Sequence, residues 1–216
     1  QNIELNKYGL PVIKKLSTFS LTVEKNPGKR MVDITKSISS IVFDLRYAGN
    51  NNFLQRKIYP ALTSSYLRQD AVKALFKVQE ELSQRGLGLK IFDAYRPYSA
   101  TEMMWELVKD DRYAADPKNG SGHNRGVAID LTIIDVKTKK ELDMGTGFDN
   151  FTDSAHHDFT ALPNEVLQNR LLLKNTMQKH GFKPLQTEWW HYALINAKEY
   201  ELLDLSFKQL KKLSKK

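Results

Sequence analysis

The chain has 216 residues, of which 41% are hydrophobic, which suits a single domain with a core of its own. Its formal charge of +8 comes from scattered basic residues without a helix-turn-helix, zinc-finger or aromatic-basic RNA motif, so we expect no nucleic-acid partner. The absence of cysteine excludes disulfides, thiolate metal sites and cysteine nucleophiles, and no apolar run is long enough to predict a membrane span.

Residues 1–30 are expected to form an N-terminal arm, residues 31–200 the main domain, and residues 201–216 a basic C-terminal segment that ends as a solvated tail. The chain begins with Gln1 rather than Met. Removal of a secretory signal is one hypothesis for that start. It would place the protein in the periplasm or cell envelope; otherwise we expect a cytoplasmic protein.

The middle of the chain predicts two helices and a strand. Asp70 can cap a helix with apolar residues at three- and four-residue steps, and Gly86 stands where such a helix stops. Alternating apolar residues from Leu87 predict a strand that ends at Arg96-Pro97. Residues 99–102, Ser-Ala-Thr-Glu, form a capping box for a second helix. Its expected buried side consists of Met103, Met104, Trp105 and Leu107.

The second half of the chain predicts more loop. Residues 137–140 resemble a hairpin turn, and residues 144–157 are rich in Gly, Asp and Thr and are expected to be irregular. A third helix fits Asn164 to His180, closed by Gly181. From Phe182 onward we expect a strand.

One stretch, Ser121 to Thr132, carries an imidazole and a carboxylate seven residues apart, His123 and Asp130. Residues an odd number apart in a strand point to opposite faces, so His123 must lie in the loop before the strand. Gly122 and Gly126 allow that bend. In the strand that follows, the odd-numbered apolar residues are expected to pack and the face with Asp130 to carry chemistry.

A second stretch supplies a third metal ligand and a base. Glu188 and His191 are three residues apart, so we place Glu188 in a turn that enters a strand carrying His191. His123, Asp130 and His191 then form a set of three protein ligands for one Zn²⁺ per chain, with the fourth position left for water as in catalytic zinc sites. Glu188 is the natural base for that water.

These two stretches resemble the S-x-H-x-x-G-x-A-x-D and E-x-W-H signatures of the zinc D-Ala-D-Ala metallopeptidases, and in detail those of VanX-type D-Ala-D-Ala dipeptidases. The resemblance extends in order and spacing over roughly residues 40 to 195. It includes Asp44 to Ala48 with Asn51-Asn52-Phe53, Asp93 to Pro97, and the run from Met144-Gly145-Thr146 through Phe148-Asp149 to His156-His157.

The resemblance implies roles for three more residues. Arg96, at the end of a strand, would place its cation near the developing oxyanion; an ordinary surface salt bridge is the alternative. Asp149 would hold the free ammonium group of a dipeptide and so reject acylated peptides. Ser121 would contact the substrate carboxylate, or alternatively cap its own loop. We expect His156 and His157 to have structural roles, and Trp189 and Trp190 to form core and pocket wall.

The sequence therefore predicts an α+β fold, with a single domain in which a small antiparallel sheet carries the zinc site and helices pack to one side. Residues 31–200 would be a zinc D-alanyl-D-alanine dipeptidase domain that hydrolyses this small free dipeptide, a cell-wall precursor, to two D-alanines. One alternative is a zinc D,D- or L,D-carboxypeptidase or endopeptidase on peptidoglycan stems. Another is a non-catalytic zinc-binding module. The oligomeric state stays open.

Overall fold

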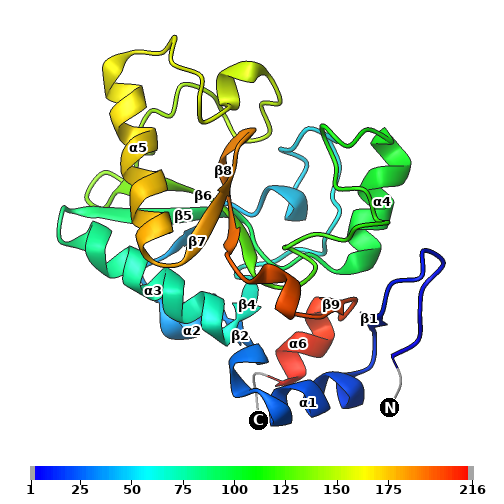
Figure 1. Ribbon diagram of the computed structural model, residues 1–216. Helices are drawn as coiled ribbons and strands as arrows, with labels where there is room; N and C mark the ends of the chain where they lie inside the picture. Colours follow the sequence, from blue (N-terminus) through cyan, green and yellow to red (C-terminus); the bar gives the residue numbers. More distant parts are fainter. Residues whose placement is uncertain (1–2, 214–216) are drawn as a thin grey trace.

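A five-stranded sheet forms the centre of the computed structural model, which describes residues 3–213 (Figure 1). The strand order is β3-β5-β6-β8-β7. All neighbours are antiparallel except β3 and β5, which run parallel, so the expectation of a purely antiparallel sheet was wrong at one edge. The strands are β3 (Val42–Phe43), β5 (Leu87–Asp93), β6 (Ala128–Asp135), β7 (Phe182–Leu185) and β8 (Glu188–Leu194).

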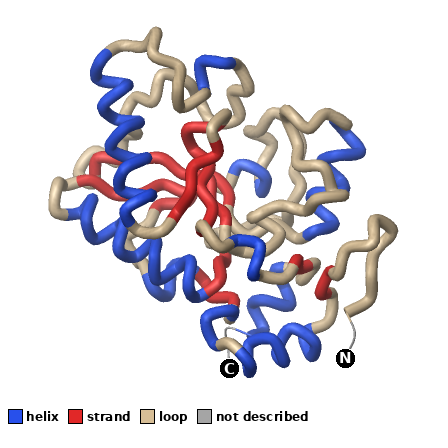
Figure 2. The backbone as a smooth tube through the Cα atoms, in the orientation of Figure 1, coloured by secondary structure: helices blue, strands red, loops and turns tan. Residues whose placement is uncertain are grey.

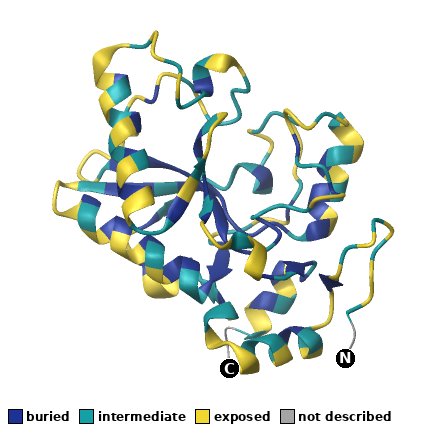
Figure 3. Cartoon of the chain, in the orientation of Figure 1, coloured by how far each residue is buried: buried dark blue, intermediate teal, exposed yellow. Residues whose placement is uncertain are grey.

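Two long helices cover one face of this sheet, α3 (Gln69–Ser83) and α5 (Asn164–Lys179), and they contact each other. In α3 the buried residues recur at three- and four-residue steps, which gives the helix one apolar stripe. The odd-numbered residues of β6 pack in the same core, whereas the outer sides of both helices are exposed (Figure 3). The mixed α+β fold with helices to one side, predicted from the sequence, is confirmed.

The N-terminal caps predicted for two helices, Asp70 and the capping box at residues 99–102, were wrong. Asp70 lies inside the first turn of α3, where its carboxylate accepts a hydrogen bond from Tyr200. In α4 (Tyr98–Val108) the capping box does not form, because the backbone and hydroxyl of Ser99 both donate to the distant Asp204. A different side of α4 is buried as well. Met104 is buried as expected, but Met103 and Leu107 are exposed, and the other buried residues are Tyr98, Ala100 and Thr101.

The region from Phe182 onward is a hairpin of two strands, β7 and β8, where a single strand was expected. The turn expected at residues 137–140 is present, since an isolated bridge joins Ile134 to Glu141 across it. Residues 144–157 are irregular, as predicted, apart from a short 3₁₀ helix, η3 (Asp153–Ala155). Figure 2 shows the strands gathered in the middle of the molecule with long loops around them.

The first and last parts of the chain lie side by side at the bottom of Figure 1, around a second apolar cluster. β1 (Val12–Ile13) pairs with β9 (Leu202–Leu203) in parallel, and β2 (Met31–Asp33) pairs with β4 (Tyr66–Arg68) antiparallel. The boundaries expected after residues 30 and 200 stay predictions, and the end of the basic tail, residues 214–216, lies outside the described residues.

The remaining helices are α1 (Leu16–Lys25), α2 (Ile34–Ser37), α6 (Phe207–Leu213) and the 3₁₀ helices η1 (Pro27–Lys29), η2 (Arg46–Ala48) and η4 (Ala197–Glu199). None of the helices between residues 3 and 213 is long and apolar enough to cross a bilayer.

Candidate active site

The register of the central sheet brings Asp130 and His191 together. Asp130 on β6 is the direct antiparallel partner of His191 on β8. Side chains of directly opposed residues leave the sheet on the same face, with Cβ atoms about 5 Å apart. Accordingly, Nδ1 of His191 lies 2.9 Å from Oδ1 of Asp130.

His123 reaches the same point from the turn before β6, as the odd spacing predicted. Gly126 has a φ of +70°, a conformation that favours glycine. Gly122 is needed for close approach, because a Cβ there would lie 2.8 Å from Cβ of Ala128. Nδ1 of His123 donates to the carbonyl oxygen of Ala94 at 2.7 Å, since a carbonyl can only accept. This bond leaves Nε2 with a lone pair directed at the other two side chains.

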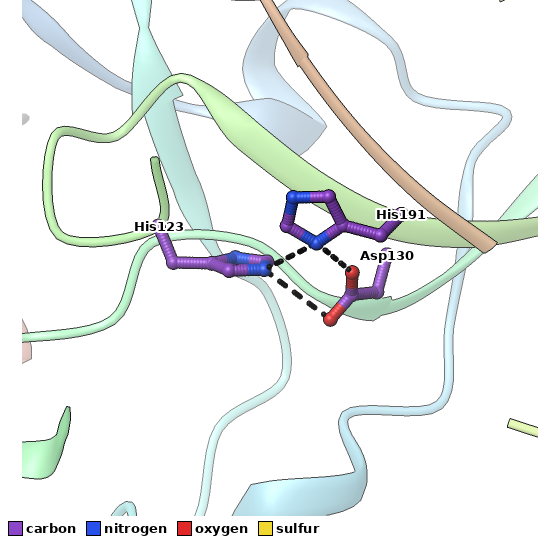
Figure 4. A group of neighbouring side chains, drawn as sticks. All are labelled: His123, Asp130 and His191. Atoms are coloured by element: carbon purple, nitrogen blue, oxygen red, sulfur yellow. Dashed lines mark hydrogen bonds and ion pairs between the residues drawn. The ribbon is translucent and has the colours of Figure 1, made fainter. Parts of the chain in front are cut away.

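The three side chains point toward one another with the spacing of a metal site (Figure 4). Nε2 of His123 lies 3.2 Å from Nδ1 of His191 and 3.4 Å from Oδ2 of Asp130. Bonds of about 2.0–2.1 Å to a tetrahedral ion require donors about 3.3 Å apart. The donor set therefore fits a divalent ion, and it is the one such cluster found among residues 3–213.

The charges in this cluster also suit a cation. Burial would raise the pKa of Asp130, but the imidazoles of His123 and His191 hold that pKa below its usual value. Burial would lower the pKa of His191, but the hydrogen bond that its ring donates to Asp130, together with the negative charges of Asp130 and Glu188, outweighs burial and raises this pKa. The carboxylate is thus ionised between two ring nitrogens, a combination of ligands that binds zinc and similar metals.

Glu188 lies beside the cluster, with Oε2 4.0 Å from Nδ1 of His191. It is the first residue of β8 and does not stand in the preceding turn, so that expectation was wrong. Glu188 and His191 line the same cavity although they are three apart in β8, and the pairing of β8 with β7 shifts register between Pro184 and Leu185, close to Glu188. Burial raises the pKa of Glu188, and His191 offsets this only in part.

Arg96 is buried, and its guanidinium faces the same cavity as the three donors. Its Nη2 donates to Oδ2 of Asp93 at 2.8 Å, and its Nε lies 3.3 Å from the hydroxyl of Tyr59. A bulge near Phe92 turns Asp93 to the position opposite Asp130. Arg96 therefore forms a salt bridge, but a buried one that holds the cation at the cavity, and not the surface salt bridge that was the alternative.

Asp149 enters the cavity from the irregular loop, where its φ is +60°. Its carboxylate oxygens lie 3.1 and 3.0 Å from the hydroxyl of Tyr47. Burial, and then the charge of Asp130, raise the pKa of Asp149 well above its usual value. Asp149 is thus a partly buried carboxyl group whose two oxygens have one hydrogen-bond donor, the Tyr47 hydroxyl, among residues 3–213.

Ser121 lies at the cavity and also caps its own loop. Its hydroxyl accepts a hydrogen bond from the backbone of Asn124 at 3.2 Å, and the Asn124 side chain accepts one from the backbone of Ser121. The loop-capping alternative is therefore present in the structure. A contact of Ser121 with substrate stays a prediction.

The cavity has a volume of about 140 Å³ and collects all seven residues singled out from the sequence. Tyr47 belongs to it as well, although it stood in a quoted motif without a role. Tyr113 and Phe151 also line it, and their rings meet edge to face at 5.0 Å. No sequence signal pointed to this aromatic pair, because the two loops that carry it are far apart in the chain.

The residues expected to be structural lie outside the donor cluster. His156 and His157 are not part of it. Burial lowers the pKa of His157 to about 4, so this ring is neutral at physiological pH. Trp189 and Trp190 are buried, and Trp190 lines the cavity, as predicted.

Comparison with known proteins gives one consistent result. A profile of the Peptidase_M15 family, described as D-ala-D-ala dipeptidase, matches residues 28–211. A protein of Escherichia coli K12 named D-alanyl-D-alanine dipeptidase is 38% identical over 173 residues, which is 80% of this chain and 89% of that relative. Proteins with the same name from Streptomyces coelicolor and Enterococcus faecalis are 31% and 28% identical and cover 74% and 76% of this chain, and 89% and 90% of their own lengths.

Among solved structures, the LdcB LD-carboxypeptidase aligns with 62% of this chain and 62% of its own, with a TM-score of 0.41 and 20% sequence identity.

Proposed function

Because the chain belongs to the Peptidase_M15 family of D-Ala-D-Ala dipeptidases, which are metallopeptidases, we propose that it is a zinc enzyme that hydrolyses the free dipeptide D-Ala-D-Ala to two D-alanines. One observation carries the proposal beyond the family. The small cavity brings together the three candidate metal donors, Glu188 next to them, and Asp149 apart from them. These are the parts that hydrolysis of a free dipeptide requires.

His123, Asp130 and His191 would hold the zinc ion. When bound, zinc supplies a water molecule of lowered pKa and polarises the carbonyl of the scissile bond. Glu188 Oε accepts the proton of the attacking water and then donates it to the leaving nitrogen as the C–N bond breaks. The burial that raises the pKa of Glu188 supports this role, because a base works best with a pKa nearer the operating pH.

Arg96 would donate to the carbonyl oxygen as negative charge develops there. Its ion pair with Asp93 and its contact with Tyr59 hold the guanidinium in place before the reaction, so little reorganisation is needed. The resulting gain applies to the transition state more than to the bound substrate.

Asp149 would bind the free ammonium of the dipeptide, and Ser121 its carboxylate. An acylated amine carries no positive charge for Asp149 to bind. A carboxylate at this position therefore favours a dipeptidase over a carboxypeptidase acting on peptidoglycan stems.

The test is the release of D-alanine by zinc-loaded protein from D-Ala-D-Ala and, separately, from N-acetyl-D-Ala-D-Ala, with Glu188→Ala as the inactive control. We expect cleavage of the free dipeptide alone. Cleavage of the acetylated peptide would assign the protein to the carboxypeptidase branch. Cleavage of neither substrate would favour the remaining alternative, a non-catalytic zinc-binding module.

A further inference from the structure

Two buried arginines outside the cavity, Arg68 and Arg170, each bind three backbone carbonyl groups. Arg68 is fully buried and Arg170 is 5% exposed. A guanidinium has five N–H donors in a rigid fork, so one such side chain can tie several chain segments together. Neither residue touches the cavity, but each one binds a loop that sends a side chain into it.

Arg68 holds the loop that carries His123. Its Nε donates to the carbonyl of Arg125 at 2.8 Å, and its backbone N–H donates to the carbonyl of Gly126 at 2.7 Å. The other two guanidinium nitrogens reach the carbonyl groups of Lys29, at 2.6 Å, and Glu201, at 3.1 Å. The residues directly after His123 are thereby attached to both terminal parts of the chain.

The surroundings of Arg68 make this attachment rigid. Its guanidinium lies between the rings of Phe19 and Tyr200, at 5.3 and 5.7 Å from their centroids. The C-terminal segment holds the same loop from its other side, because the backbone N–H of Leu203 donates to the carbonyl of Asn124 at 3.0 Å.

Arg170 holds the loop that carries Asp149. From α5, its Nε donates to the carbonyl of Met144 at 2.7 Å, where the loop begins. Its Nη2 and Nη1 donate to the carbonyl groups of Ser154, at 2.8 Å, and His156, at 3.2 Å, where the loop ends. One side chain therefore joins the two ends of the segment, and Asp149 lies between them.

We propose that Arg68 and Arg170 are positioning residues with separate tasks: Arg68 fixes the His123 loop and so sets metal affinity, and Arg170 fixes the Asp149 loop and so sets affinity for the substrate ammonium. The second half rests on the function proposed above for Asp149. The first half requires only that the His123 cluster binds a metal.

Arg68→Lys and Arg170→Lys test the proposal, because an ammonium keeps the charge but cannot span three carbonyl groups. Three quantities are measured for each variant: Zn²⁺ affinity by competition with a chromogenic chelator, hydrogen exchange of residues 121–126 and 144–156, and kcat and KM for D-Ala-D-Ala at saturating zinc.

For Arg68→Lys we expect zinc affinity to fall about 10- to 100-fold, the usual effect of losing outer support of a ligand, with faster exchange in residues 121–126 and an unchanged KM. For Arg170→Lys we expect unchanged zinc affinity, faster exchange in residues 144–156, and a KM raised about tenfold with a much smaller change in kcat, the pattern of lost substrate binding.

If zinc affinity falls and KM rises to the same extent in both variants, the arginines support only the fold in general. Unchanged zinc affinity in Arg68→Lys would overturn the first half of the proposal. If a Lys variant does not fold, Glu201→Gln and Asn169→Ala replace it. Glu201 forms an ion pair with Arg68. The side-chain amide of Asn169 donates a hydrogen bond of 2.9 Å to the carbonyl of Asp143, which lies just before the loop that carries Asp149. Smaller effects in the same directions are then expected. The absence of any effect would contradict the proposal.

The outcome stays separable from that of the proposed function. If the wild-type protein does not cleave D-Ala-D-Ala, the proposed function fails. Zinc affinity and hydrogen exchange still decide whether each arginine controls its own loop.

Discussion

The hydroxyl of Tyr47 lies within 3.1 Å of both carboxylate oxygens of Asp149, although the two residues are 102 positions apart in the chain. Tyr47 is buried, and its ring packs edge-on against Phe148, the neighbour of Asp149. A phenol has one proton to donate, whereas a carboxylate has about four acceptor sites. Asp149 is thus held in place and keeps the capacity to bind an ammonium group.

Asp149→Asn is expected to raise KM for D-Ala-D-Ala by about tenfold to a hundredfold, with a smaller change in kcat. A hydrogen bond to a charged group contributes about 1.5–3 kcal/mol, and the amide loses that charge. Steady-state kinetics measure the effect. Asp153→Asn is the matched control, because this side chain of the same loop is 93% exposed. Equal KM values for the wild type and Asp149→Asn would remove Asp149 from substrate binding.

The pH dependence of kcat/KM follows from the raised pKa of Asp149. Asp149 must be ionised to hold an ammonium, so kcat/KM is expected to fall as the pH drops through that pKa, which lies above the ordinary value of 3.8. The hydrogen bond from Tyr47 lowers this pKa, so Tyr47→Phe should move the acid limb to higher pH. A pH profile of each variant checks this, and an unmoved limb in Tyr47→Phe would contradict it.

The stability of the fold is expected to depend on pH in the opposite direction to kcat/KM. A carboxyl group whose pKa is raised in the folded state stabilises the fold most at low pH, and this contribution is lost as the pH rises through the folded-state pKa. Asp149→Asn is therefore expected to raise Tm at neutral pH while it weakens substrate binding. Thermal unfolding at pH 4 and pH 7 measures the difference, and a lower Tm for the variant at pH 7 would refute the expectation.

Glu188→Gln is expected to lower kcat by about 10²- to 10⁴-fold, the usual contribution of a positioned general base. The bound zinc should stay, because Glu188 is not one of the three donors. Activity and zinc content are measured on the same sample. Glu165→Gln, an exposed residue in the first turn of α5, is the control. Full activity in Glu188→Gln would require another base.

Removal of the metal with a chelator is expected to abolish activity and lower Tm, and added zinc should restore both, because a ligand that binds only the folded state stabilises it. His123→Ala should lose this response, since only two donors remain. His156→Ala should keep it, because His156 lies outside the cluster. A zinc response retained in His123→Ala would show that the ligand set is wrong.

Gly126→Ala is expected to destabilise the protein more than Gly86→Ala, although both glycines have φ near +70°. The left-handed conformation costs an alanine about 1–2 kcal/mol at either position. Only at Gly126 would the new Cβ meet a neighbour, the buried Met31 sulfur at 2.8 Å, whereas nothing lies within 4 Å at Gly86. Denaturant unfolding gives the two values, and zinc affinity should fall in Gly126→Ala alone. Equal values would mean that Met31 moves aside freely.

Local pattern in the sequence determined much of the scaffold. The helix from Asn164, the alternation that buries one face of β6, and the position of His123 in the loop before it all follow from neighbours a few residues apart. That His123 would lie beside Asp130 could be predicted for the same reason, since an odd spacing and two glycines restrict where His123 can lie. The predicted cluster of His123, Asp130 and His191 as candidate metal donors is present in the structure.

Tertiary structure alone decided how these side chains meet. Asp130 faces His191 because of the register between two strands about 60 residues apart in the chain, and Asp93 faces Asp130 because of a bulge. At the start of α4, the backbone N–H of Ser99 donates a hydrogen bond to Asp204, and the helix's own capping box does not form. Register, bulges and such distant caps depend on which segments pair, and the pattern within one segment contains no information about its partner.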